Sequence, residues 1–120
     1  MSKYGNVSTY MFGICFRSKA EATHALWLES ELQANKILEW IYEKRYLLEV
    51  NGSLVATHKP DFTIVLKDGR EVVHEVKGGR ATMTEAWALR RNLFEAIYPH
   101  IKYEVFANWE SRRRRYIWGL

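Results

Sequence analysis

The spacing of hydrophobic positions divides the first third of the chain into a short strand and a helix. Residues 9–16 are rich in apolar side chains and include Gly13, which indicates a short strand or a turn. Ser18 and Glu21 form a capping-box pattern, and the apolar residues behind them recur at helical spacing. Asn35 is suited to the end of this helix.

The middle of the chain predicts strands joined by tight turns. Residues 37–50 are ambiguous between helix and strand, and we interpret them as a short turn followed by a strand from about Tyr42. Asn51-Gly52 is the strongest hairpin signal in the sequence. The strand that follows covers residues 54–66 and is interrupted at Pro60.

A second hairpin and a second helix complete the pattern. Asp68-Gly69 predicts a turn into a strand over residues 71–77. A helix that Thr82 or Thr84 can cap follows and runs to about Ile97, with Leu89 and Phe94 on the apolar face that we expect to be buried. Residues 101–107 form a last strand. The order strand–helix–three strands–helix–strand predicts an α/β fold in which two helices flank a small mixed central sheet.

Composition narrows the class of protein. The 120 residues, 48% hydrophobic and 27% charged, fit one globular domain over residues 1–120. We expect a flexible N-terminus over about 1–8 and a basic, aromatic C-terminal tail over about 108–120. The single Cys15 excludes an internal disulfide, is expected in the core, and is typical of a cytoplasmic protein. We expect neither a membrane span nor a secretory signal, because no apolar run is long enough.

Two carboxylates and a lysine are predicted to converge at one end of the second hairpin. A tight turn at Asp68-Gly69 places Asp61 opposite Val76, so that Asp61 and Glu75 approach each other. Strand alternation puts Glu75 and Lys77 on one face and Val76 in the core. Mg²⁺ prefers oxygen ligands, which Asp61, Glu75 and the Val76 carbonyl could supply. Lys77 could orient or deprotonate a metal-bound water, or neutralise a phosphate.

At these residues the sequence resembles a known nuclease signature. Pro60-Asp61 followed by Glu75-Val76-Lys77 is similar to the motif of the PD-(D/E)xK nuclease superfamily. Residues 13–22 resemble the opening of small phage-associated endonucleases of that superfamily, which are similar to Holliday-junction resolvases. The resemblance covers about residues 13–103, most of the chain.

The resemblance implies a fold, an activity and a third acid. It implies a restriction-endonuclease-like core, commonly a homodimer, that cleaves DNA phosphodiesters, often on branched duplexes, with Mg²⁺ or Mn²⁺. An acid on the first helix completes the metal site in the superfamily, and by position this is Glu21, binding directly or through water. Glu29 is the next alternative. A phage-encoded protein of this kind would work in the bacterial host cytoplasm.

Basic side chains indicate how DNA could be held. The formal charge of +4 and the pI near 9.3 suit a polyanionic partner. The arginine run near the C-terminus lies among Trp109, Tyr116 and Trp118, which suits base stacking, although such a tail could instead pack against a partner subunit. The candidate DNA-binding residues are Lys59, Arg80, Arg90, Arg91, Arg112, Arg113, Arg114 and Arg115.

The histidines show no close pair along the sequence that would indicate a histidine-based nuclease. His58 lies near the predicted site and could contact phosphate. His74 alternates away from Glu75 to the other face of its strand. His24 is interpreted as a helix-surface or core residue.

Simpler interpretations of the acids stay open. Asp61 could organise a turn, Glu75 and Lys77 could form a solvated pair, and Glu21 could only cap its helix. Two classes of function therefore fit the sequence: a metal-dependent DNA endonuclease, or a non-catalytic basic nucleic-acid-binding or assembly module on a nuclease scaffold. The endonuclease is the leading hypothesis, because carboxylates in a central hairpin require a compensating partner such as a metal.

Overall fold

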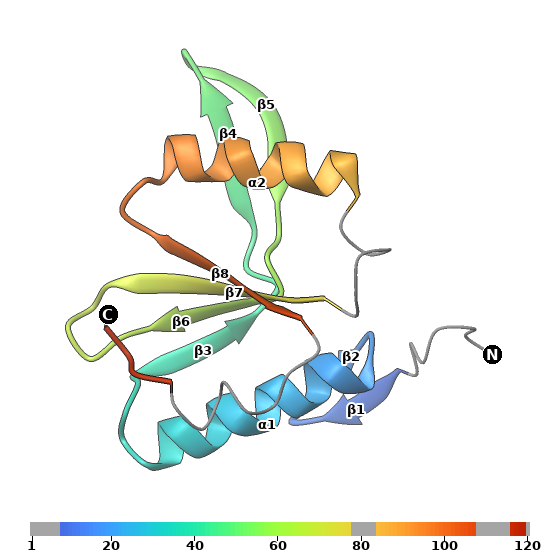
Figure 1. Ribbon diagram of the computed structural model, residues 1–120, viewed down its shortest axis with the longest axis vertical. Helices are drawn as coiled ribbons and strands as arrows, with labels where there is room; N and C mark the ends of the chain where they lie inside the picture. The colour runs from blue at the N-terminus through green and yellow to red at the C-terminus, as the bar shows by residue number, and fades with distance from the viewer. Residues whose placement is uncertain (1–7, 78–83, 108–115, 120) are drawn as a thin grey trace.

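The computed structural model describes residues 8–77, 84–107 and 116–119, and it confirms an α/β fold with a mixed sheet and two helices. Among the described residues, two strands precede the first helix and five lie between the helices, where one and three were expected (Figure 1). The elements are β1 (Thr9–Met11), β2 (Ile14–Phe16), α1 (Lys19–Gln33), β3 (Glu39–Tyr42), β4 (Tyr46–Val50), β5 (Ser53–His58), β6 (Phe62–Val65), β7 (Glu71–Lys77), α2 (Glu85–Ile97) and β8 (Lys102–Ala107).

Left-handed backbone positions explain two of the three additional strands, and the expected interruption at Pro60 explains the third, since it separates β5 from β6. Phe12 and Gly13 have φ angles of 57° and 75°, so the first apolar stretch folds back as the β1–β2 hairpin. Glu43 has a φ of 56° and separates β3 from β4. One strand was expected from about Tyr42. The structure has two instead: β3 begins earlier, at Glu39, and ends at Tyr42, and β4 begins at Tyr46.

The main sheet has four strands in the order β3-β6-β7-β8. The first two pairings are antiparallel, whereas β7 and β8 are parallel, and α2 belongs to the crossover that parallel strands need. In the β6–β7 hairpin Phe62 pairs with His74. Continuing this register places Asp61 level with Glu75, one residue before the predicted Val76.

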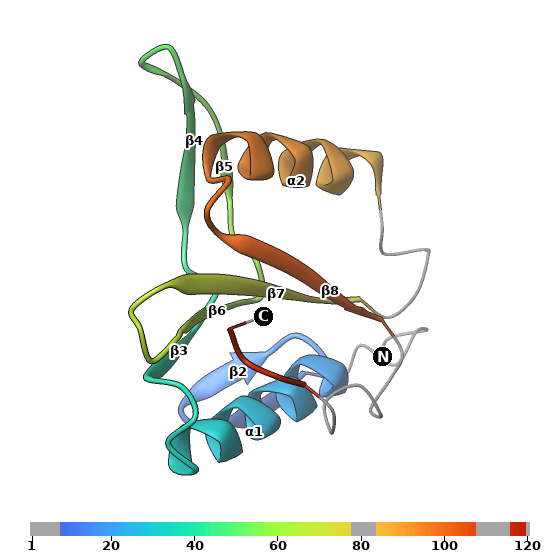
Figure 2. The same cartoon turned by 60° about the vertical axis from the view of Figure 1, so that its left-hand side comes forward.

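The two faces of the sheet carry separate cores, because side chains alternate along each strand. α1 packs on one face, where Leu28 meets Phe62 and Ile64. α2 and the β4–β5 hairpin cover the other face, where Phe94 meets Val73. Figures 1 and 2 show the sheet between these two layers. Burial of each such side chain stabilises the fold by about 1.5–3 kcal/mol.

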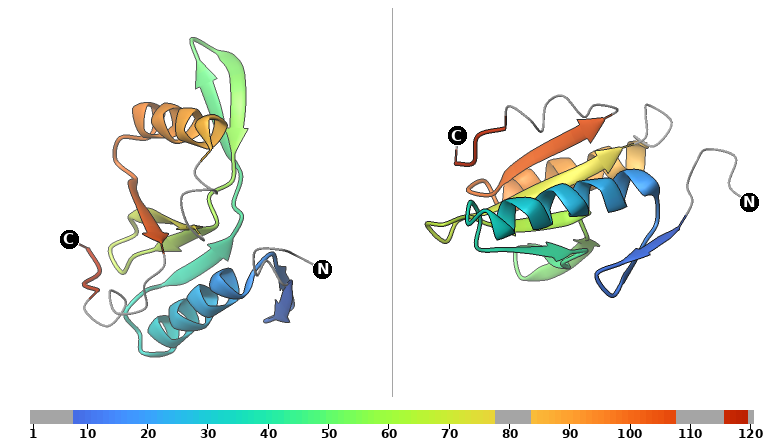
Figure 3. Two further views of the ribbon diagram at one scale, coloured as in Figure 1. Left: turned by 45° about the vertical axis from the view of Figure 1, so that its right-hand side comes forward. Right: turned by 90° about the horizontal axis from the view of Figure 1, so that it is seen from below.

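The β4–β5 hairpin extends past α2, away from the main sheet (Figure 3). It is a separate two-stranded sheet in which Tyr46 and Leu48 face the core, whereas Leu54 and Val55 are exposed. Cys15 is also exposed, and the expectation of a core cysteine is wrong: alternation along β2 turns Phe16 inward and Cys15 outward.

The described end of the chain lies against α1. The rings of Tyr116 and Trp118 lie 5.4 and 5.3 Å from the ring of Trp27, centroid to centroid. Tyr116 and Trp118 of the expected tail are therefore packed on the fold, which leaves these two rings less available for stacking on bases. Within the described ranges, no helix is long and apolar enough to cross a membrane.

Candidate active site

The predicted acids meet on the side of the molecule where β3 and β7 end and both helices begin (Figures 1 and 2). Asp61 and Glu75 are each only 4% exposed. The Asp61 N–H donates to Glu75 Oε1 at 2.9 Å, and the Val76 N–H donates to Asp61 Oδ2 at 2.7 Å. These two backbone donors fix both carboxylates beside one another at the end of β7.

Lys77 lies on the same side of β7 as Glu75, towards α2. Its Nζ is 3.4 Å from Glu75 Oε2 and 4.5 Å from the centroid of the Trp87 ring, and its side chain is 13% exposed. Val76 packs towards the opposite core, as alternation predicts. Since one strand residue directs its N–H and C=O to the same neighbour, the Val76 carbonyl lies at the edge of β7 that faces Asp61.

Glu21 reaches this site from the first turn of α1. Ser18 Oγ accepts a hydrogen bond from the Glu21 N–H at 3.1 Å, as the capping pattern predicts. The Glu21 carboxylate does not return to Ser18: it accepts from the Arg17 N–H at 3.2 Å and from the Tyr42 hydroxyl. Glu21 therefore faces the end of β3 and the acids. Glu29, the alternative acid, is bound to the indole of Trp40 instead.

Arg17 and Glu43 join the site, and sequence reasoning missed both. Arg17 Nη2 lies 3.1 Å from Asp61 Oδ1, 3.1 Å from Glu43 Oε2 and 3.7 Å from Glu21 Oε2. The Glu43 N–H donates to the Asp61 carbonyl at 2.9 Å, which holds the turn after β3 against the start of β6. The four-residue separation of Arg17 from Glu21 could have signalled their ion pair, whereas nothing local marks Glu43.

The two central acids of this cluster, Asp61 and Glu75, ionise less readily than free carboxyl groups do. Burial raises the pKa of Asp61 to about 8, and the Glu75 and Glu21 carboxylates add to the rise against the Val76 N–H and Arg17. Burial also raises the pKa of Glu75, although Lys77 opposes it. Burial lowers the pKa of Arg17, but Tyr42 and the three carboxylates outweigh it and the net shift is upward.

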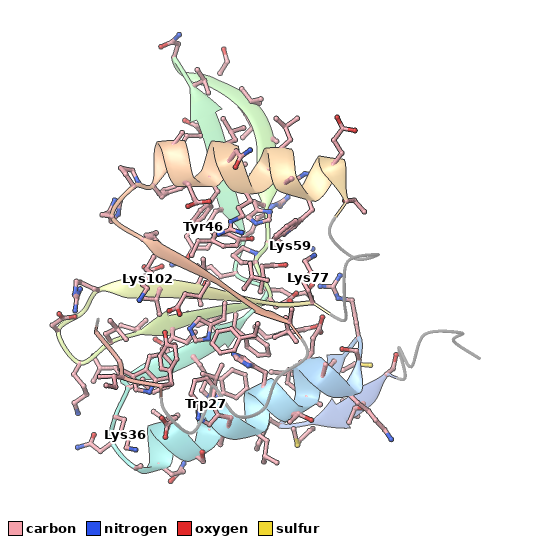
Figure 4. All side chains as sticks on the ribbon, in the orientation of Figure 1. Trp27, Lys36, Tyr46, Lys59, Lys77 and Lys102 are labelled. Carbon is pink, nitrogen blue, oxygen red and sulfur yellow. The ribbon has the colours of Figure 1, made fainter. Side chains whose placement is uncertain are left out.

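Positive charge and aromatic rings border the site on the α2 side. The Arg91 guanidinium lies 4.9 Å from the Tyr103 ring centroid and 3.0 Å from Glu95, and Arg90 is exposed. Lys59 is exposed just before Pro60, and Figure 4 shows Lys59 and Lys77 in the region between α2 and the end of β7. The remaining candidate DNA-binding residues lie outside the described residues: Arg80, Arg112, Arg113, Arg114 and Arg115.

His58 lies beneath this border and is buried. Its Nε2 is 2.9 Å from the Tyr103 hydroxyl. Burial lowers the pKa of His58 to about 4, and the positive charges of Arg90 and Lys77 add to the effect. The expected contact between His58 and phosphate is therefore not supported, because the ring is turned into the core.

Residues 1–116 match a family described as "Protein of unknown function (DUF1064)". The chain belongs to this family. No curated protein and no solved structure matches it. Because membership of this family assigns no activity, a function has to be argued from the geometry of the site.

The carboxylate oxygens of the acids are the type of ligand that a hard divalent cation prefers. Asp61, Glu75 and Glu21 supply oxygen ligands. Burial raises the pKa of Asp61, and the neighbouring Glu75 and Glu21 carboxylates, whose charge a cation would offset, raise it further. In the described part of the chain, however, no group of three or more His, Cys, Asp or Glu side chains is placed to hold a metal ion. Instead Arg17 Nη2 contacts both the Glu21 and Asp61 carboxylates.

Two histidines do meet, on the opposite face of the sheet. His24 Nε2 lies 2.9 Å from His74 Nδ1, and both rings are fully buried beside Trp27. The separation of 50 positions concealed this pair, because only the packing of α1 on β7 brings the two rings together. His74 does face away from Glu75, as alternation predicts.

Proposed function

We propose that this protein is a divalent-metal-dependent endonuclease that hydrolyses DNA phosphodiester bonds. The observation that supports it most is the pair of buried carboxylates, Asp61 and Glu75, held by backbone donors at the end of one strand with Lys77 beside them. Crowding buried acids together opposes folding, and groups perturbed in this way concentrate at functional sites. A capping or solvated role would not need this burial.

In this proposal, Asp61, Glu75 and the Val76 carbonyl hold Mg²⁺ or Mn²⁺, and Glu21 binds it directly or through water. The bound metal supplies a water of lowered pKa and stabilises charge on the phosphate. Lys77 is held against Trp87, so its ammonium is positioned to orient that water or to neutralise the phosphate. Glu75 accepts from the Asp61 N–H, which keeps its other oxygen towards Lys77.

We further propose that basic residues hold the DNA backbone. Arg91 contacts the Trp87 ring, as Lys77 does, and Arg90 is close enough to His58 to affect its pKa. Figure 4 shows Lys59 in the same region, from which a phosphate could reach Lys77. The contacts of these basic residues with DNA would be independent of sequence and sensitive to salt. Branched DNA as substrate and a homodimer as the active form follow from the resemblance alone. A dimer would place two sites symmetrically, as cleavage of two strands requires.

The test is nicking of supercoiled plasmid in Mg²⁺ or Mn²⁺, with EDTA as the metal-free control. Glu75→Gln should abolish cleavage, because it removes a proposed metal ligand, and should leave DNA binding within a few-fold, because the basic residues proposed to hold DNA are unchanged. Glu49→Gln, an exposed acid on the β4–β5 hairpin, is the matched control and should cleave normally. Cleavage by Glu75→Gln at the wild-type rate would overturn the assignment. A four-way junction compared with linear duplex and single strands then tests selectivity, and sedimentation tests the dimer.

A non-catalytic DNA-binding module is the second candidate. It is favoured by Arg17, which neutralises the acids without a metal, and by the lack of a preformed three-ligand group within the described residues. A mobility shift of the plasmid without nicking in any divalent metal would support it and reject the endonuclease.

A further inference from the structure

We propose that Arg17 is a positioning residue that neutralises the acidic cluster in the metal-free protein and transfers to a DNA phosphate when a divalent cation binds. This inference rests on the proposed metal site, and it assigns a role to a side chain outside that ligand set. It is carried by the way one guanidinium nitrogen contacts three carboxylates that come from three separate segments.

Arg17 closes the cluster from the solvent side. Its side chain is 63% exposed, whereas the side chains of Asp61 and Glu21 are 5% and 8% exposed. Nη2, at the end of the guanidinium, is the atom that contacts the carboxylates, and most of the side chain is exposed. A change of rotamer can therefore withdraw it without disturbing either core.

A divalent cation and the Arg17 guanidinium compete for the same oxygens. Asp61 Oδ2 accepts one hydrogen bond from the Val76 N–H, and Oδ1 is the oxygen that Arg17 contacts. A cation bound to this carboxylate through Oδ1 would therefore lie directly beside the guanidinium. Two positive charges at that oxygen would repel each other. Metal binding must therefore weaken the Arg17 contact, and an arginine that loses a carboxylate finds its other preferred partner in a phosphate.

Glu43 provides a position for Arg17 outside the metal ligands. It is the most exposed of the three carboxylates, at 28%, and lies at the same 3.1 Å from Nη2 as Asp61 does. Its left-handed φ of 56° is uncommon for a residue other than glycine, and such conformations concentrate at functional sites. The turn thus directs an acid at Arg17 at some conformational cost. When Asp61 binds the cation in the absence of DNA, Arg17 can stay paired with Glu43, and a DNA phosphate then replaces Glu43 as its partner.

The first experiment measures Mn²⁺ affinity by calorimetry without DNA. Arg17→Ala should bind Mn²⁺ about 3- to 10-fold more tightly than wild type, because a competing charge is gone. Lys19→Ala removes an exposed cation two residues away, for which the described structure records no ion pair, and should change the affinity less than twofold. Equal or weaker Mn²⁺ binding by Arg17→Ala would overturn the proposal, since an arginine that only holds the acids in place predicts that result.

The second experiment measures duplex DNA affinity in EDTA and in Ca²⁺, which binds oxygen ligands as Mg²⁺ does. Arg17→Ala should weaken DNA binding by about tenfold in Ca²⁺ and by less than twofold in EDTA, the range of one charge-assisted contact. An equal loss in both media would refute the transfer. Arg17→Lys keeps the positive charge but lacks the planar guanidinium, and it should retain the wild-type Mn²⁺ affinity. Urea unfolding of each variant checks that it folds.

The two arms separate this inference from the proposed function. In one outcome the wild type cleaves DNA, Glu75→Gln does not, and Arg17→Ala binds Mn²⁺ with the wild-type affinity. This result would support the nuclease and refute the transfer of Arg17. If the wild type neither cuts nor binds DNA, the nuclease fails, and a tighter Mn²⁺ site in Arg17→Ala would still show that Arg17 competes with the cation.

Discussion

Because burial raises the pKa of Asp61, we expect the free energy of unfolding of the metal-free protein to fall as pH rises through neutrality. Asp61 has an ordinary pKa of 3.8 when unfolded and about 8 when folded. Between these values the folded chain holds a proton that the unfolded chain has released. Unfolding therefore releases a proton in this range, and the free energy of unfolding falls as pH rises. Asp61→Asn removes the titrating group and should flatten the profile.

The size of the effect follows from the linkage relation. One proton corresponds to a slope of about 1.4 kcal/mol per pH unit. Between pH 6 and pH 7.5 the wild type should lose about 2 kcal/mol more than Asp61→Asn does. The asparagine also alters the contacts with Val76 and Arg17, and this shifts the whole curve. The comparison therefore uses the slope, which a pH-independent offset does not change.

Urea unfolding followed by tryptophan fluorescence in EDTA measures these slopes. Asp68→Asn is the matched control, because Asp68 is exposed and its pKa is lowered by the backbone N–H and side chain of Arg70, so that it titrates below the window. Parallel profiles for the wild type and Asp61→Asn would refute the electrostatic account of the site. Mn²⁺ at pH 7.5 should raise the stability of the wild type by mass action, and less so for Asp61→Asn.

Two further predictions concern the α2 side. His58 has a folded pKa of about 4, below its ordinary 6.5, so it stays neutral in the fold, and stability should fall by on the order of 1–3 kcal/mol as pH drops through that interval. His58→Phe should flatten this acid limb in urea unfolding, and an unchanged limb would contradict the assignment. Arg90→Ala should weaken duplex binding and reduce the slope of log affinity against log salt by about 0.9. Arg70→Ala, at the opposite end of the β6–β7 hairpin, is the control, and equal slopes for the two variants would exclude Arg90 from the DNA contact.

Local chemistry made much of the fold predictable. Asn51 and Gly52 have left-handed φ angles of 52° and 80°, and Gly69 has 90°, which are the conformations that these turn residues favour. The strand over residues 71–77 has the bounds that the sequence predicts. Such features depend on a few neighbouring residues, so they can be recognised without knowledge of the tertiary structure.

The features that depend on distant packing could not be predicted in this way. The break between β3 and β4 occurs at Glu43, a residue type that does not signal a left-handed turn, so residues 37–50 remained ambiguous. Leu89 was expected on the buried face of α2 but is exposed, because Phe94 and Trp87 face the β4–β5 hairpin and the sheet instead. The pairing of β3 with β6 and the meeting of His24 with His74 are likewise non-local.

In the candidate site, too, the local features could be predicted from the sequence and the features that depend on distant packing could not. Motif and register were enough to bring Asp61, Glu75 and Lys77 together, because they lie on one hairpin. Glu21 required the family resemblance, since its place near the acids depends on how α1 docks on the sheet. The contact between Arg17 and Glu43 depends on that docking and on an unusual φ angle as well, and neither leaves a pattern in the sequence.

The two cations that touch the acids are held differently, and this argues for different roles. Lys77 is 13% exposed, packed over Trp87 and paired with Glu75, so any reorientation must break contacts with α2. Arg17 is 63% exposed, and its contacts with the acids lie at the end of its side chain, so it can exchange partners within a rotamer change. In the proposed nuclease, a fixed ammonium suits a step that needs one geometry at each turnover. A guanidinium that can withdraw suits a proposed metal site whose acids need a positive charge beside them until the cation binds.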